Sequence, residues 1–431
     1  MTQPTDTNTN HDRPYLIVGS VIASTFFIGF GGGVIFPIIP NLGVILGISP
    51  FLVGLILSAN RFARLLANAP AGILVDRIGT RKPFVFGLVI QGAGTVGYII
   101  AVESQLPEAW FLGSRIVWGL GSALVFATAY TIAADVSPSD SRGMSMGLIR
   151  GGSIFGFPSG LVMGGVVADV FGIVEAFVVA AAFALFAALL AFLTVPETHV
   201  EEDVRRSVSP WDIDTSLPTV TIGLVNFTIF FAYLGALFAT LVLFLDEIDV
   251  RVFGLDAQGT SGIFMAVTVI AAALFMILGG YLSDRSHSRV PTLISFIGLT
   301  FVGFLLLVFA TSFEGLLLAC LLIGSGQGGM NAPLIAMLAD ITPIERMGRA
   351  TGTNNILGDI GGGLGPLLTL PAIDHIGFAP VYAACAFLPL LAGIVLLVGI
   401  HRETGEWAPG SQESDPDISV DEGTALPERQ D

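Results

Sequence analysis

The chain contains 431 residues, of which 53% are hydrophobic and 12% are charged, with a formal net charge of −16. A soluble chain of this length has about 25% charged residues, so most of this protein's surface does not face water. The composition therefore excludes a soluble globular domain, and the acidic balance argues against a nucleic-acid partner.

Uncharged runs long enough to cross a bilayer, about 20 residues each, recur along the chain. They are too long for alternating β-strands, so an all-α membrane protein is predicted. The uncharged run 14–60 allows two passes, with a break expected near Pro40 and Pro50. Because the residues before it are polar and the first apolar run is a full span, we expect no cleavable signal peptide. The twelve predicted transmembrane helices are 15–38, 50–74, 84–103, 109–134, 144–168, 174–195, 218–245, 258–282, 290–311, 315–339, 348–372 and 378–400.

Arginine is concentrated in the loops that follow the even-numbered spans, whereas the loops after the odd-numbered spans carry only Arg251. The positive-inside rule therefore predicts a multi-pass protein of the cell membrane with both termini in the cytoplasm. The basic residues of the even loops are Arg77, Arg81, Lys82, Arg142, Arg205, Arg206, Arg285, Arg289, Arg346 and Arg349.

Acidic residues are concentrated in the linker 197–214 and in the tail after Arg402, and Lys82 is the single lysine. An acid excess with arginine in place of lysine is typical of a high-salt, haloarchaeal cytoplasm; an ordinary acidic tail is the alternative. The cysteines, Cys320 and Cys385, fall inside spans and are interpreted as small packing residues.

The chain repeats itself. The stretch GILVDRIGTR at 72–81 matches GYLSDRSHSR at 280–289, and a second match at nearly the same spacing aligns Asp135 with Asp340. Two related halves that enclose a midplane site are a common design of secondary transporters. The predicted parts are a disordered cytoplasmic N-terminus at 1–13, a six-helix half at 14–195, a cytoplasmic linker at 196–217, a second six-helix half at 218–401 and an acidic disordered cytoplasmic tail at 402–431.

The pattern G-x-L-x-D-R-x-G-x-R at 72–81 resembles the signature loop of the major facilitator superfamily (MFS). RIVWGLGSA at 115–123 resembles the family's helix 4 motif, and ADVSPSDSRGMSMG at 134–147 resembles its helix 4–5 loop. The resemblance covers about residues 14–401 and is to drug-efflux-type members. It implies two six-helix pseudo-repeats that move by alternating access.

This resemblance assigns a gating role to the signature loop. Asp76 is expected to meet the N-terminus of helix 11, which carries a partial positive charge, and Arg77 is expected to reach Asp135. A topology anchor without a gating role is the alternative. Because His287 replaces the second glycine, the copy at 280–289 is expected to make a weaker latch. The candidate gating residues are Gly72, Asp76, Arg77, Gly79, Arg81, Asp135, Gly280, Asp284 and Arg285.

Polar residues inside the spans are candidates for binding substrate or coupling ions. Arg64 and Asp359 both lie roughly 18 Å from the cytoplasmic ends of their helices, so Asp359 is expected to pair with Arg64 or Arg61. A purely structural ion pair is the alternative. The family's cavity-lining helices 1, 4, 7 and 10 supply further candidates. The full set is Asn60, Arg61, Arg64, Arg115, Arg150, Asn226, Tyr233, Gln327, Asn331 and Asp359.

Helix 5 carries a ladder of glycines at a spacing of four residues, with Pro158 inside it. This pattern partly matches the family's antiporter motif, and close helix packing through small residues is the alternative. The ladder consists of Gly152, Gly156, Gly160 and Gly164.

Several possible sites are rejected. GSGQGG at 324–329 lies inside a span with no preceding strand, so it is not a dinucleotide site. The sequence has no phosphate-binding loop with Lys and Ser or Thr, so ATP is not the expected energy source. No histidine lies at mid-membrane depth, and we expect no metal or cofactor.

The predicted function is secondary active transport of a small organic solute, leaning to proton-coupled efflux of amphipathic compounds. An organic anion or sugar transporter, and a non-transporting sensor or interaction protein, are the alternatives. The expected partners are a small-molecule substrate, coupling protons and the lipid bilayer, and we expect a monomer.

Overall fold

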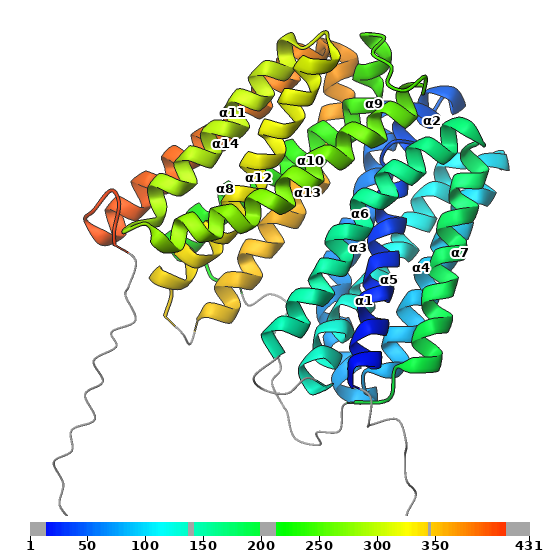
Figure 1. Ribbon diagram of the computed structural model, residues 1–431, viewed down its shortest axis with the longest axis horizontal. Helices are drawn as coiled ribbons and strands as arrows, with labels where there is room; N and C mark the ends of the chain where they lie inside the picture. The colour runs from blue at the N-terminus through cyan, green and yellow to red at the C-terminus, as the bar shows by residue number, and fades with distance from the viewer. Residues whose placement is uncertain (1–13, 137–141, 199–212, 344–345, 411–431) are drawn as a thin grey trace, which may run out of the picture.

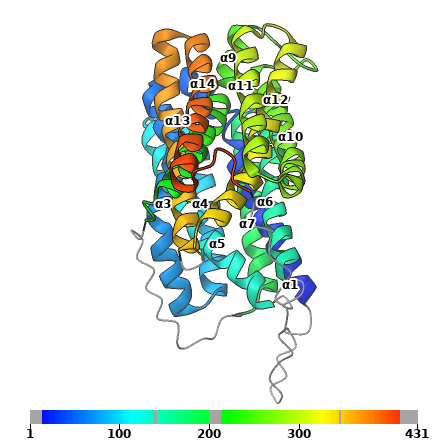
Figure 2. The ribbon, with the colours of Figure 1, turned by 90° about the vertical axis from the view of Figure 1, so that its left-hand side faces the viewer.

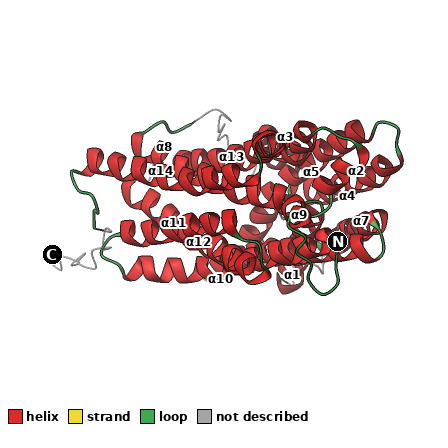
Figure 3. Ribbon diagram, turned by 90° about the horizontal axis from the view of Figure 1, so that it is seen from above, coloured by secondary structure: helices red, strands yellow, loops and turns green. Residues whose placement is uncertain are grey.

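The computed structural model describes residues 14–136, 142–198, 213–343 and 346–410, and it is built from helices (Figure 1, Figure 3). Twelve of its segments are long and apolar enough to cross a membrane. The helices are α1 (Pro14–Val34), α2 (Ile39–Leu46), α3 (Pro50–Ile78), α4 (Arg81–Glu103), α5 (Pro107–Val136), α6 (Arg142–Val170), α7 (Ile173–Thr194), α8 (Leu217–Phe230), η1 (Phe231–Leu237), α9 (Phe238–Glu247), α10 (Ala257–Arg285), α11 (Arg289–Phe309), α12 (Phe313–Ile341), α13 (Met347–Ile376) and α14 (Phe378–Thr404).

The predicted twelve spans are confirmed, and most of their ends agree within a few residues. The first span is longer than predicted, because it continues through a turn after Val34 into α2 and ends at Leu46. Pro40 lies in the first turn of α2, where a proline costs little, and so it does not end the span. Pro37 in the turn lacks an N–H group, which explains why α1 stops before it.

The seventh span is α8, η1 and α9 in one continuous run, Leu217–Glu247. Its middle, η1, is a π-helix with the sequence FAYLGAL. Such wide turns inside α-helices are found mostly at functional sites. Tyr233 lies in this segment, at the centre of the molecule.

We call the end of the bundle where α1 begins and α14 ends the terminal face, and the other end the opposite face. Figure 2 views the bundle from the C-terminal half, with α14 toward the viewer. The positive-inside rule predicts that the terminal face lies in the cytoplasm. The predicted tail and linker lie largely outside the described residues.

The hydrophobic core shows how the two halves are joined. Toward the opposite face, one cluster of buried residues includes Leu57 of the N-terminal half and Phe238 of the C-terminal half. Toward the terminal face, each half has its own cluster, one around Phe84 and one around Leu293. The halves therefore share a core at one end and separate toward the other, as their diverging helices show (Figure 1).

Glycine allows the halves to approach closely at the opposite face. A Cβ atom on Gly262 of α10 would meet the backbone oxygen of Leu161 in α6, and a Cβ atom on Gly54 of α3 would lie 2.5 Å from the backbone oxygen of Pro366 in α13. No side chain other than hydrogen fits at these two crossings.

Candidate functional site

A cavity of about 540 Å³ lies between the two halves. It is bounded by α1, α3, α5 and α6 from one half and by η1, α10, α12 and α13 from the other. Six predicted site residues line it: Asn60, Arg61, Arg64, Tyr233, Gln327 and Asn331. This size and a mixed polar and apolar lining are typical of small-molecule sites.

The predicted ion pair across the halves is present. Arg61 and Arg64 of α3 both donate to the same carboxylate oxygen of Asp359 in α13, with an Arg61–Asp359 distance of 3.2 Å. The three side chains are 16%, 25% and 17% exposed, so the pair is largely withdrawn from solvent. The sequence predicted that Asp359 pairs with Arg64 or Arg61. In the structure both arginines bind the carboxylate, because they lie one helical turn apart on the same face of α3.

Arg115 does not line the cavity. Its side chain is 1% exposed, and its guanidinium group donates to the carbonyls of Ile56 at 3.2 Å and Leu57 at 2.9 Å and to the Asn60 amide at 2.6 Å. Arg115 therefore ties α5 to α3 and lies behind two residues of the cavity wall, Asn60 and Trp118. Its contact with substrate stays a prediction.

Asn226 is also absent from the cavity lining, because its amide donates at 2.9 Å to the carbonyl of Asn354 and joins α8 to α13. The side chain of Arg150 lies outside the described residues.

Sequence reasoning missed part of the cavity wall, namely Trp118, Phe126, Ser153, Phe157 and Asn355. Trp118 and Phe126 are eight residues apart on α5, two helical turns, and Asn355 is one turn before Asp359. This helical spacing was the sequence signal that could have identified these residues as part of the cavity wall. Ser153, Phe157 and Asn355 lie on the fifth and eleventh spans, outside the expected lining helices 1, 4, 7 and 10, whereas Trp118 and Phe126 lie on the fourth span itself.

The signature loop makes different contacts from those predicted. Asp76 and Arg77 are exposed and form no hydrogen bond or ion pair with other described residues. Asp135 instead accepts a hydrogen bond from the Thr198 hydroxyl at 3.0 Å. The predicted Arg77–Asp135 contact is therefore wrong for this conformation. Asp135 contacts Thr198, at the start of the linker, instead.

Glu197, which was not among the predicted site residues, caps the signature loop at 72–81. Its carboxylate accepts hydrogen bonds from the Thr80 amide at 2.6 Å and from the Arg81 amide at 3.4 Å, at the positive N-terminus of α4. Gly79 has a φ of 84°, and a Cβ atom there would collide with Glu197. Gly79 therefore makes a tight turn that favours glycine, whereas Gly72 has no neighbour within 4 Å of its Cβ position.

The second copy of the signature loop, at 280–289, forms ion pairs with neighbouring residues. Arg289 donates to Asp284 at 2.6 Å and to Asp340 at 2.9 Å, which closes an ion-pair cluster inside the C-terminal half. Arg285 stacks on Tyr281, with its guanidinium carbon 4.4 Å from the ring centroid, and a Cβ atom on Gly280 would lie 3.4 Å from the Ala332 side chain. These contacts lie within one half, so the weaker latch expected of this copy stays a prediction.

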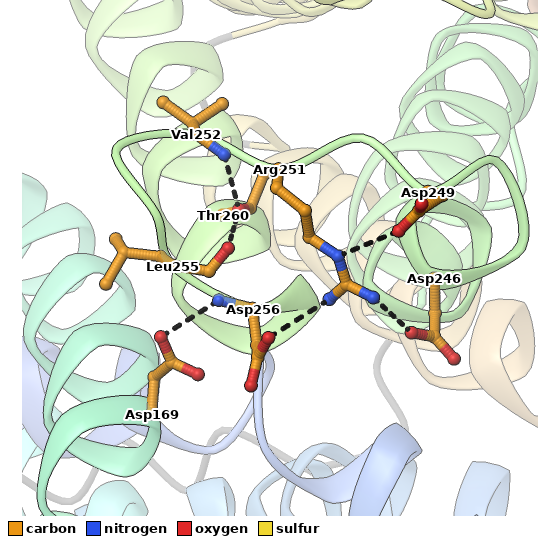
Figure 4. A network of polar contacts seen from close by, with 8 residues as sticks. All are labelled: Asp169, Asp246, Asp249, Arg251, Val252, Leu255, Asp256 and Thr260. Carbon is orange, nitrogen blue, oxygen red and sulfur yellow. Dashed lines mark hydrogen bonds and ion pairs between the residues drawn. The ribbon is translucent and has the colours of Figure 1, made fainter.

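A polar network holds the halves together at the opposite face (Figure 4). The Asp169 carboxylate at the end of α6 accepts a hydrogen bond of 3.0 Å from the backbone amide of Asp256, the residue that precedes α10. Arg251 bridges Asp246, Asp249 and Asp256 at 3.0, 3.2 and 3.7 Å. Burial lowers the pKa of Arg251, but its hydrogen bonds to Asp249 and Asp246 outweigh this and raise it.

The glycine ladder of α6 faces α1. Cβ atoms on Gly156 and Gly160 would collide with the backbone oxygens of Phe26 and Phe30. These contacts are those of close helix packing, the alternative interpretation. Its role as an antiport signature stays a prediction.

Comparison with known proteins identifies the family. The Major Facilitator Superfamily model matches residues 21–366 and 253–426. The chain belongs to this superfamily. It is therefore a multi-pass secondary transporter and not an enzyme.

The superfamily also contains the chain's curated relatives. An uncharacterized MFS-type transporter of Methanocaldococcus jannaschii is 25% identical over 88% of this chain and 97% of its own. Multidrug resistance protein 2 of Bacillus subtilis is 24% identical, covering 88% of this chain and 92% of the relative. The quinolone resistance protein NorA of Staphylococcus aureus is 24% identical, covering 86% and 93%.

Solved structures share the fold. The nucleoside transporter NupG matches with a TM-score of 0.75 and 16% identity, covering 89% of this chain and 99% of that one. A bacterial homologue of the lysosomal transporter Spinster, in an inward-facing occupied conformation, matches with a TM-score of 0.72 and 17% identity, covering 91% and 97%.

Proposed function

We propose that this MFS transporter exports small amphipathic organic compounds by proton-coupled alternating access. One observation carries the proposal: the cavity of about 540 Å³ lies between halves that share a core at the opposite face and have separate cores at the terminal face. A solute can then enter from one side only. Rocking of the halves would expose the same cavity to the other side.

The cavity wall supports an amphipathic cargo. Phe36, Trp118, Phe126 and Phe157 supply aromatic surface, and amide side chains such as Asn331 supply hydrogen bonds. The positive-inside rule places the open terminal face in the cytoplasm, where an exporter loads its substrate. Distant relatives are named as multidrug resistance proteins, which favours export.

Asp359 is the proposed site of proton coupling. It is the carboxylate that joins the halves beside the cavity, through Arg61 and Arg64. A proton on Asp359 would remove its charge and release both guanidinium groups. Protonation at one side of the membrane would thus change how strongly the halves are held together.

The test is transport of a fluorescent amphipathic compound in proteoliposomes, with pH gradients of either polarity. Wild-type protein should show transport that responds to the gradient, and Asp359→Asn should lose that response while retaining exchange of the compound. Glu403→Gln, an exposed carboxylate of α14, is the matched control. Gradient-driven transport at the wild-type rate in Asp359→Asn would overturn the coupling role.

A further inference from the structure

The cavity presents positive charge. Arg61 and Arg64 line it, whereas Asp359 does not, and among the described residues no aspartate or glutamate appears in its wall. Both arginines donate to one oxygen of the single carboxylate. Two cations therefore share one anion at this site, and the cations face the space that a ligand would fill.

A third arginine adds to this excess. Arg115 is bonded to Asn60, which itself lines the cavity, and its other acceptors are the neutral carbonyls of Ile56 and Leu57. A third guanidinium group therefore lies directly behind the cavity wall, next to Asn60. Uncompensated charge is costly inside a membrane protein, so a negatively charged ligand has a large electrostatic advantage here.

The remaining wall fits an aromatic scaffold. The Arg64 guanidinium carbon lies 5.9 Å from the ring centroid of Phe126, and Trp118 and Phe157 stand in the same wall. Arginine beside aromatic rings can bind a carboxylate through its N–H groups while the rings cover the apolar part of the same molecule.

We propose that the cavity selects organic anions, namely aromatic compounds with one carboxylate or sulfonate, and that this anion replaces Asp359 as the partner of Arg64 and Arg61. The inference deepens the proposed function, because it names the chemical class of the exported compound. Replacement of Asp359 loosens the ion pair that joins α3 to α13. Binding of the cargo is thereby linked to separation of the halves.

Three compounds of nearly the same shape test the charge preference: naphthalene-2-carboxylate, its neutral amide and 2-naphthylmethylammonium. Binding to the detergent-solubilised full chain is measured by isothermal titration calorimetry. The carboxylate should bind about tenfold tighter than the amide, the difference expected for a charge-assisted hydrogen bond, and the cation should bind weakest. Equal or weaker binding of the carboxylate, or binding of none of the three, overturns the proposal.

Two variants assign the preference to the arginines. Arg64→Gln should abolish the advantage of the carboxylate over the amide, whereas Arg402→Gln, an exposed change of the same charge, should retain it. If Arg64→Gln does not fold, Arg61→Gln should reduce the same ratio. A full preference in the folded variant contradicts the assignment. Transport of the cation without the carboxylate would refute the anion proposal and leave the export proposal intact.

Discussion

Each end of the interface between the halves has a carboxylate that can meet the N-terminus of a helix in the other half. Only one of these two contacts is formed in this conformation. At the opposite face, Asp169 of the N-terminal half accepts a hydrogen bond from Asp256 at the start of α10, in the C-terminal half. At the terminal face, Asp76 is the residue predicted to meet the start of α13 in the same way, and it is exposed without a described partner. One carboxylate-to-helix contact is made and the other is not.

This difference leads us to predict that each face has its own latch and that the two are used alternately. A carboxylate at a helix N-terminus contributes about 0.3–2 kcal/mol, enough to bias two conformations without locking either. Asp359 lies between the two faces and forms the ion pair that joins α13 to α3 there.

The largest expected effect belongs to this middle contact. Asp359→Asn leaves Arg61 and Arg64 without their carboxylate and should lower the free energy of unfolding by about 3–5 kcal/mol. The double variant Asp359→Asn with Arg64→Gln should recover much of that loss, as measured by thermal unfolding in detergent. Normal stability of the single variant would show that the pair does not hold the halves in register.

Packing at the opposite face should give the next largest effect. In Gly262→Ala the new methyl group meets the backbone of Leu161 in the other half, so the faces must move apart, at a cost of about 1–3 kcal/mol. Gly72→Ala at the terminal face is the matched control, because its Cβ position is open. Equal thermal stability of the two variants would contradict the tight contact at the opposite face.

The cap at the signature loop should have a smaller effect. Glu197→Ala removes the acceptor for the Thr80 and Arg81 amides and should destabilise the N-terminal half by about 1 kcal/mol. Hydrogen exchange of the first turn of α4 measures this. Unchanged protection of the Thr80 and Arg81 amides from exchange would show that Glu197 does not stabilise the loop.

The smallest expected effect is a pH dependence at Asp214. Burial raises its pKa, but hydrogen bonds from Ser216 and the charges of Arg346 and Arg349 outweigh this and lower it. The stabilisation is present above the ordinary aspartate pKa of about 4 and is lost as pH falls through the lowered value. The melting temperature of Asp214→Asn should therefore approach that of wild type on acidification. A constant difference would contradict this linkage.

The spans and the pair across the halves could be predicted because each depends on local features: apolar length for the spans, and matching depth for Arg64 and Asp359. The contacts of Asp76 could not be predicted, since they depend on which face is open. The contacts of Arg115 could not be predicted either, because a buried arginine can donate to backbone carbonyls such as that of Leu57. The role of Glu197 depends on where the linker returns, which no periodicity encodes.

The alternate use of the two latches can be tested by measuring distances between spin labels across each face. Suitable pairs of exposed positions are Phe51 with Ile376 at the opposite face and Ile78 with Gly348 at the terminal face. Asp169→Ala should lengthen the first distance and shorten the second, and Asp76→Ala added to it should prevent the shortening. Unchanged distances in Asp169→Ala, or the same shortening in the double variant, would contradict alternate latching.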